Sequence, residues 1–232
     1  MLNQPRLALA SAFVTSLLAL AARAEDPKPN DATLGAKPPK GAIVLFNGRN
    51  LDGWLSKDGK SPAGWTAIDG VLHVKPGKGD IQTDKNFGDF TLHLEFNIPN
   101  MPDQHGQARG NSGVYLTGNT ELQVLDSYGL KSQNNDCGAI YLQITPKYNV
   151  CKPPLQWQTY DVDFKKARVE GGKVLAKARI TVKQNGVVII DDAEIKPTPG
   201  GNGTPEGSAG PLMLQDHGNL VQYRNIWIVP KN

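Results

Sequence analysis

Between Asp89 and Ile98 the sequence alternates strictly between polar and apolar residues, and this repeat constrains the fold more than any other feature. A period of two is typical of a β-strand with one buried face, formed here by Phe90, Leu92, Leu94, Phe96 and Ile98. Hairpin signals at Asp69-Gly70 and Asn185-Gly186 separate further short apolar runs. The 25 glycines and 17 prolines supply frequent turns, and no capped helical stripe follows the first 24 residues. We therefore predict an all-β fold, a two-sheet sandwich of the jelly-roll type.

The first 24 residues have the pattern of an export signal and not of a folded domain. A lone arginine precedes an apolar run that closes on the small residues of Ala22-Arg23-Ala24. This pattern predicts a signal peptide over 1–24 and a secreted or periplasmic mature protein. Residues 25–42 are polar and rich in proline, which predicts a disordered linker, and 43–232 form one predicted domain.

The net charge of the chain limits the kinds of molecule that it is expected to bind. The chain carries 25 basic and 22 acidic residues, and loss of Arg6 and Arg23 with the signal peptide leaves 23 basic residues. This near-neutral balance, without a basic block, argues against binding of nucleic acid. No other segment is apolar enough for stable insertion into a membrane. We expect a neutral partner.

The sequence contains two cysteines, Cys137 and Cys151. In an exported protein this spacing predicts one structural disulfide. The bridge would close a loop of about 15 residues and stabilise the fold by about 3 kcal/mol. Two thiols alone make a poor metal site, because zinc normally takes four ligands.

Two predicted strands combine a buried side with a face of ionisable and amide groups. In the strand at 121–126, alternation places Glu121 and Gln123 on one face. Gln215 and His217, two residues apart, share a face in the same way. Asp126 is five residues from Glu121, so an ideal strand sends it to the opposite face. Either a β-bulge re-aims it or it is a turn residue at the end of the strand.

Seven short motifs carry a resemblance to a known family. They span 45–54, 109–116, 121–126, 137–141, 155–160, 214–218 and 223–226. Their types and order, from about 44 to 229, resemble the 3-keto-disaccharide hydrolase domain, which was long catalogued as a domain of unknown function. One departure is Thr120, where the family pattern leads us to expect an aromatic residue, so substrate preference is expected to differ here.

The resemblance implies a concanavalin A-like lectin/glucanase sandwich and a hydrolase that acts on oligosaccharides or other glycosides bearing a ketone at C3. The ketone acidifies the hydrogen on C2, so a base can remove it and the substituent on C1 can leave. Such chemistry needs a base, an acid for the departing oxygen and donors for the enediolate charge. The resemblance suggests that Glu121 and His217 line one concave face as this catalytic pair, in an order left open.

Further polar and aromatic residues of these motifs are candidates for binding substrate, namely Gln123, Gln215, Asn111, Arg224, Tyr141, Trp157 and Asp126. Several have a structural alternative. Arg224 either supplies a fixed positive charge to the site or pairs with an aspartate of 161–163. Tyr141 and Trp157 either form a stacking platform or are buried. Asn111 either donates to sugar hydroxyls or forms a tight turn.

Neither a cofactor nor a metal is expected from the sequence. A divalent metal held by His93, Glu95 and His217, or a structural calcium in an acidic loop, is the alternative, but no HxH, HExxH or EF-hand spacing supports it. Gln123 stands where laminarinase-type retaining glycosidases tend to carry a carboxylate, which argues against double-displacement hydrolysis. The rival function is a non-catalytic carbohydrate-binding module that uses the same face.

Overall fold

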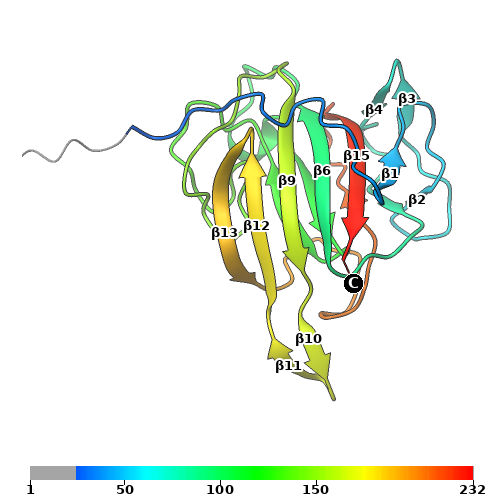
Figure 1. The fold of residues 1–232 in the computed structure, drawn as a ribbon. Coiled ribbons are helices and arrows are strands. Elements are labelled where there is room, and N and C mark those ends of the chain that lie inside the picture. The colour runs from blue at the N-terminus through cyan, green and yellow to red at the C-terminus, as the bar shows by residue number, and fades with distance from the viewer. Residues whose placement is uncertain (1–24, 232) are drawn as a thin grey trace, which may run out of the picture.

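The computed structural model describes residues 25–231, and the signal peptide predicted at 1–24 lies outside them. The larger sheet contains, in spatial order, β13 (Val187–Ile195), β12 (Ala178–Gln184), β9 (Gln158–Lys165), β6 (Phe90–Asn97), β15 (Gln222–Pro230), β4 (Val71–His73) and β3 (Thr66–Ile68), with β1 (Ile43–Phe46) also paired to β15 (Figure 1). The smaller sheet contains β2 (Trp54–Ser56), β5 (Ile81–Thr83), β14 (Met213–Leu214), β7 (Ser112–Leu116) and β8 (Thr120–Val124).

A separate hairpin of β10 (Arg168–Glu170) and β11 (Lys173–Ala176) projects from the end of the larger sheet (Figure 1). Every strand pair among residues 25–231 is antiparallel. The helical content of this range is one 3-10 turn, η1 (Gly106–Ala108), and no helix there has the length and apolarity to cross a membrane. The predicted all-β, two-sheet sandwich is confirmed.

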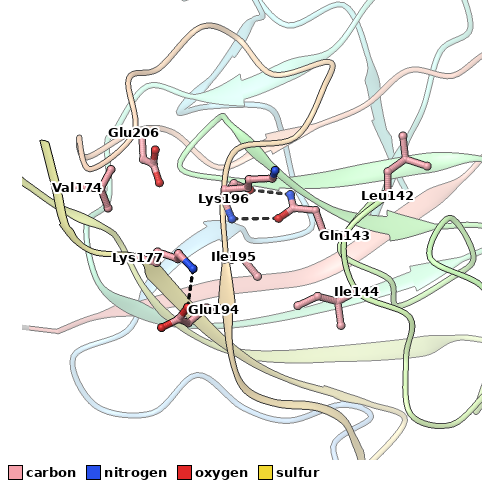
Figure 2. A pocket seen from close by; sticks show the side chains of 9 residues that line it. All are labelled: Leu142, Gln143, Ile144, Val174, Lys177, Glu194, Ile195, Lys196 and Glu206. Atoms are coloured by element: carbon pink, nitrogen blue, oxygen red, sulfur yellow. Dashed lines mark hydrogen bonds and ion pairs between the residues drawn. The ribbon is translucent and has the colours of Figure 1, made fainter. Parts of the chain in front are cut away.

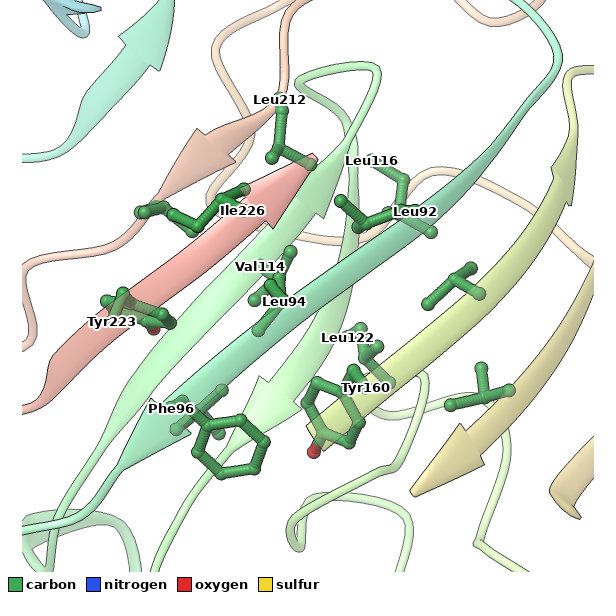
Figure 3. Close-up of a cluster of buried hydrophobic side chains, with 14 of the residues drawn as sticks. Leu92, Leu94, Phe96, Val114, Leu116, Leu122, Tyr160, Leu212, Tyr223 and Ile226 are labelled. Carbon is green, nitrogen blue, oxygen red and sulfur yellow. The ribbon is translucent and has the colours of Figure 1, made fainter. Parts of the chain in front are cut away.

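The two sheets bury their facing sides against each other. In β6, Leu92, Leu94 and Phe96 point into the core as their alternation predicts, toward Val114 and Leu122 of the smaller sheet (Figure 3). Each such side chain contributes about 1.5–3 kcal/mol when it is removed from water. Because the apolar residues of β7 and β8 fill the core, their alternate residues must point to the opposite side of the smaller sheet.

The segment expected to be a disordered linker, 25–42, lies against the outer face of the larger sheet (Figure 1). The Asn30 amide donates to the Asn185 carbonyl at 3.0 Å, and the Gly35 amide donates to Glu95 Oε1 at 2.6 Å. The Thr33 and Thr159 hydroxyls are 2.9 Å apart. Polar groups on this face therefore bind the segment through its backbone amides and the Thr33 side chain, which its composition alone does not reveal.

The predicted disulfide is wrong, because Cys137 and Cys151 are free, buried thiols. The Gln184 amide donates to both sulfur atoms, at 3.4 and 3.3 Å. The Tyr160 hydroxyl donates to the Gln123 carbonyl at 2.6 Å and lies 3.1 Å from the Cys137 sulfur. Core packing and these polar contacts hold the 137–151 loop, so the stabilisation expected from a bridge does not apply.

Candidate active site

A small cavity of about 130 Å³ opens on the side of the smaller sheet that faces away from the core. It is lined by Gln107, Asn111, Tyr115, Glu121, Gln123, Tyr141, Pro199, Gly200, Gln215 and His217. Six of the nine residues predicted for the catalytic and binding site are in this set. They are Glu121, His217, Gln123, Gln215, Asn111 and Tyr141.

The register of β7 against β8 places the polar groups of this cavity. Tyr115 lies opposite Glu121, and Gly113 lies opposite Gln123. The Glu121 side chain folds over Gly113, where a Cβ atom would lie only 2.4 Å from Glu121 Oε1. The glycine of the Asn-Ser-Gly motif thus provides the space that the carboxylate occupies.

Glu121 is the buried acid of the cavity, with 3% of its surface exposed. Burial raises its pKa to about 7, the charge of Asp80 adds to this shift, and a hydrogen bond from Tyr115 opposes it. In that bond the Tyr115 hydroxyl donates to Glu121 Oε2 at 2.9 Å. A carboxyl group that titrates near neutrality can give and take a proton at physiological pH, which suits general acid–base catalysis.

Tyr115 links this acid to the opposite wall of the cavity. Its hydroxyl accepts a hydrogen bond from Gln215 Nε2 at 3.2 Å, and Gly200 packs so closely that a Cβ atom there would lie 2.4 Å from the phenol oxygen. Burial, with the charge of Glu121, raises the pKa of Tyr115 far above its usual value, so the phenol stays protonated. The sequence reasoning missed Tyr115, although its position across a tight hairpin from Glu121 was a usable signal.

A group of amides forms the far side of the cavity. Gln123 Nε2 donates to Gln107 Oε1 at 2.9 Å, and Asn111 Nδ2 donates to the Gln107 carbonyl at 2.8 Å. Gln107, which lies in η1, was also missed by the sequence reasoning. The buried oxygens Asn111 Oδ1 and Gln215 Oε1 have no hydrogen-bond partner within residues 25–231. Buried acceptors normally have a partner, and both oxygens belong to residues that line the cavity, so they are candidates for hydrogen bonds from a ligand.

His217 is exposed and lines the same cavity, two residues beyond Gln215. Hydrogen bonds hold the turn that carries His217 against the residues just before β5. The Asp216 amide donates to Asp80 Oδ1 at 2.9 Å, and Asp216 Oδ2 accepts from the Gly79 amide at 3.0 Å. The structure therefore brings a buried carboxyl group and an exposed imidazole to one hollow.

Arg224 and Trp157 do not line this cavity, which corrects the placement expected from sequence. Arg224 lies on β15 and Trp157 precedes β9, both in the larger sheet. The Arg224 guanidinium stacks 4.0 Å from the centre of the Trp157 ring and pairs with Glu95 Oε2 at 2.7 Å. Its acidic partner is thus Glu95 and not an aspartate of 161–163.

Asp126 also lies outside the cavity lining. Its Oδ2 atom is 3.1 Å from Arg109 Nε, and its Oδ1 accepts from the Tyr128 amide at 3.3 Å. It is therefore a turn residue just beyond the end of β8, which agrees with the structural alternative. The metal ligand set considered from sequence does not assemble, because His93 and Glu95 lie on the larger sheet. Within residues 25–231 no group of three or more histidine, cysteine or acidic residues is arranged to hold a metal.

A larger groove of about 620 Å³ is lined by residues of 142–144 and 194–196 and by Val174, Lys177 and Glu206 (Figure 2). Gln143 and Lys196 form two hydrogen bonds across it, of 2.8 and 3.1 Å, and Lys177 pairs with Glu194 at 2.8 Å. None of the predicted site residues lines this groove. We therefore assign the candidate active site to the smaller cavity, which both Glu121 and His217 line.

Comparison with known proteins identifies the family of this chain. The profile of a family described as a 3-keto-alpha-glucoside-1,2-lyase-like domain matches residues 41–229. A crystal structure of a candidate glycosyl hydrolase from Parabacteroides distasonis ATCC 8503 is 34% identical, with a TM-score of 0.78, over 96% of this chain and 100% of that chain. No curated protein matches significantly.

Two other candidate glycosyl hydrolases of that organism share the fold. Their TM-scores are 0.61 and 0.57, their identities are 21% and 24%, and the matches cover 83% and 82% of this chain and 95% and 99% of theirs. The family profile spans most of the chain and carries the 3-keto-disaccharide hydrolase label that the sequence motifs suggested. The chain therefore belongs to the 3-keto-α-glucoside-1,2-lyase-like domain family.

Proposed function

We propose that this protein cleaves glycosides oxidised to a ketone at C3 by elimination across C1 and C2, followed by addition of water. The observation that carries this proposal is the buried Glu121, whose pKa of about 7 and shared cavity with His217 suit proton transfer. Direct hydrolysis by two carboxylates would need a second acid about 5 to 10 Å away across the sugar, and an amide, Gln123, occupies the neighbouring position on the same face.

In the first step the ionised Glu121 carboxylate takes the proton from C2, and the electron pair forms an enediolate with the C3 carbonyl. The C1–oxygen bond then breaks, a C1–C2 double bond forms and the C3 carbonyl returns. The departing oxygen takes a proton from the His217 imidazolium. Water subsequently adds its hydroxyl to C1 and a proton to C2, which releases a 3-keto sugar.

The size of the cavity supports this order of acid and base. A volume of about 130 Å³ is small beside the roughly 300–1,000 Å³ of drug-sized pockets, so it admits one sugar ring at most. The group attached at C1 must then project toward solvent, where His217 is exposed. Glu121 is buried, with 3% of its surface exposed, so in this proposal it contacts the ring and is the base.

The amides orient the bound sugar in this proposal. Asn111 Oδ1 and Gln215 Oε1 are buried acceptors without a protein partner among residues 25–231. Hydroxyl groups of the sugar would satisfy both oxygens, and two such bonds fix the rotation of the ring. A fixed ring keeps C2 against Glu121, which is the positioning that raises the rate of an otherwise bimolecular step.

The test is incubation of the protein with a 3-keto disaccharide and, separately, with its unoxidised parent, in D₂O. Elimination and hydration predict cleavage of the ketone only, and a deuterium atom at C2 of the released sugar above an enzyme-free control. Glu121→Gln and His217→Gln should each lower kcat/KM by about 10²- to 10⁴-fold. Glu194→Gln, an exposed control in the other groove, should not.

Other outcomes separate the alternatives. Cleavage of the unoxidised parent, or a Glu121→Gln variant that keeps the wild-type kcat/KM, would contradict the elimination. Binding of both sugars without cleavage would instead support the carbohydrate-binding function considered from sequence.

A further inference from the structure

An ion pair behind the cavity joins two of its walls. Lys57 Nζ lies 2.9 Å from Asp80 Oδ2 and also donates to the Gly200 carbonyl at 2.8 Å. Asp80 Oδ1 accepts from the Asp216 amide at 2.9 Å. The pair thereby connects the loop at Gly200 with the turn that carries His217, although Lys57 and Asp80 themselves follow β2 and precede β5.

We propose that Lys57 and Asp80 are positioning residues that hold the Gly200 loop and the His217 turn around Glu121. This inference rests on the proposed function, because it assigns a role in assembling that site. Neither residue lines the cavity, so neither is proposed to touch the substrate. The Asp80 side chain is only 12% exposed and the Lys57 side chain 41%, so the pair is partly protected from solvent and more firmly placed than a free surface pair.

The contacts of the loop at Gly200 show how Lys57 would hold this loop in place. Gly200 lies directly against the Tyr115 hydroxyl, which donates to Glu121. Thr198 Oγ1 accepts from the Glu121 amide at 2.9 Å, so the same loop also touches the backbone of the acid. Without the bond from Lys57, the Gly200 carbonyl loses its partner and the loop can move away from Tyr115.

The electrostatic part follows from the charges around Glu121. Tyr115 faces it from β7, Tyr141 from the 139–144 segment and His217 from the turn after β14. The charged pair Asp80 and Lys57 stands behind them, with Asp80 raising the pKa of Glu121. Removal of Asp80 leaves an unpaired cation that favours ionised Glu121, whereas removal of Lys57 leaves an unpaired anion that disfavours it.

Removal of Asp80 and removal of Lys57 should therefore shift the pH dependence of kcat/KM in opposite directions. Because the ionised form of Glu121 is the active base, kcat/KM rises with pH through its pKa. Asp80→Asn should move this rising limb to lower pH and Lys57→Met should move it to higher pH, each by roughly half a unit to one unit. Both variants should also lower kcat, because both release part of the tether.

The experiment compares pH profiles of kcat/KM with the ¹³C NMR titration of the Glu121 carboxyl carbon in the full-length mature protein. Lys177→Met and Glu194→Gln break an exposed pair of similar length, 2.8 Å, in the other groove and should leave both readouts unmoved (Figure 2). Lys57→Arg keeps the charge and should restore the position of the limb. Thermal unfolding checks that each variant is folded. If one variant is not folded, the direction in which the other variant shifts the pKa of Glu121 still tests the proposal.

Shifts of the same sign, or equal losses of kcat without any shift in the limb or in the NMR titration, would overturn the positioning role. The NMR titration does not depend on turnover. An inactive wild-type protein that still shows opposite shifts would therefore contradict the proposed function and leave the pair as the feature that positions and tunes Glu121.

Discussion

Replacement of Glu121 by glutamine should stabilise the protein at neutral pH and lower kcat/KM by about 10²- to 10⁴-fold. Glutamine has the shape of the protonated acid and can accept the same hydrogen bond from Tyr115. It therefore isolates the effect of charge. The wild-type carboxyl has a pKa of about 7 in the folded protein against an ordinary value of 4.5, mainly because it is buried.

The size and sign of the effect follow from this difference. A carboxyl whose folded pKa exceeds its unfolded pKa contributes stability below 4.5, and that contribution is lost as the pH rises to about 7. One pKa unit corresponds to about 1.4 kcal/mol, so the loss amounts to about 3 kcal/mol. The Glu121→Gln variant has no carboxyl group at this position and does not lose this stability as the pH rises.

The assay is urea unfolding of wild type and variant from about pH 4 to about pH 8, with the difference in unfolding free energy as the readout. The variant should gain about 3 kcal/mol relative to wild type across this range. Glu95→Gln is the matched control, because hydrogen bonds lower the pKa of that buried acid despite the opposing effect of its burial. Because the pKa of Glu95 is held at about 2, its contribution to stability changes with pH mainly below about 4.5, so the Glu95→Gln difference should be nearly flat from about pH 5 to about pH 8. A difference for Glu121→Gln that is flat with pH would refute the argument that burial holds this acid near neutrality.

Three further predictions concern the same two sheets. Gly113→Ala places a methyl group 2.4 Å from Glu121 Oε1, so steady-state kinetics should show kcat reduced about 10²-fold, while urea unfolding changes by only about 1 kcal/mol. Arg224→Met leaves Glu95 without its cation, and the unfolding free energy should fall by about 2 kcal/mol with kcat and KM unchanged. A large loss of activity there would instead tie Arg224 to catalysis. The two buried thiols should resist alkylation in the native protein, and mass spectrometry should find both alkylated after unfolding without reductant.

The strand pattern predicted the sandwich and the polar faces well, because alternation is a local property of the chain. Leu92, Leu94 and Phe96 face the core, and Glu121 and Gln123 share the opposite side of the smaller sheet, as their spacing requires. The order of the motifs placed the main cavity residues through the family resemblance.

Alternation does not reveal which of the four faces of a sandwich a side chain occupies. Arg224 and Trp157 belong to the right motifs, but Arg224 lies on β15 and Trp157 just before β9 of the larger sheet, so neither lines the cavity. Lys57 and Asp80 come from short connections, whose positions depend on contacts distant in sequence. The free thiols likewise depend on the exact spacing of two loops in the core, which the interval between Cys137 and Cys151 does not fix.

The two buried glutamates show why the environment, and not the residue type, separates function from structure here. Both lie on the polar face of a strand, and Glu95 is even less exposed, at 1%, than Glu121. Burial alone would raise the pKa of Glu95, but hydrogen bonds from His93, Asn225 and Arg224 outweigh it and hold the pKa at about 2. Glu121 receives one hydrogen bond from a neutral phenol and keeps the raised pKa that burial imposes. An acid fully paired with a cation binds its partners too well to exchange protons, so of the two only Glu121 is available for acid–base chemistry.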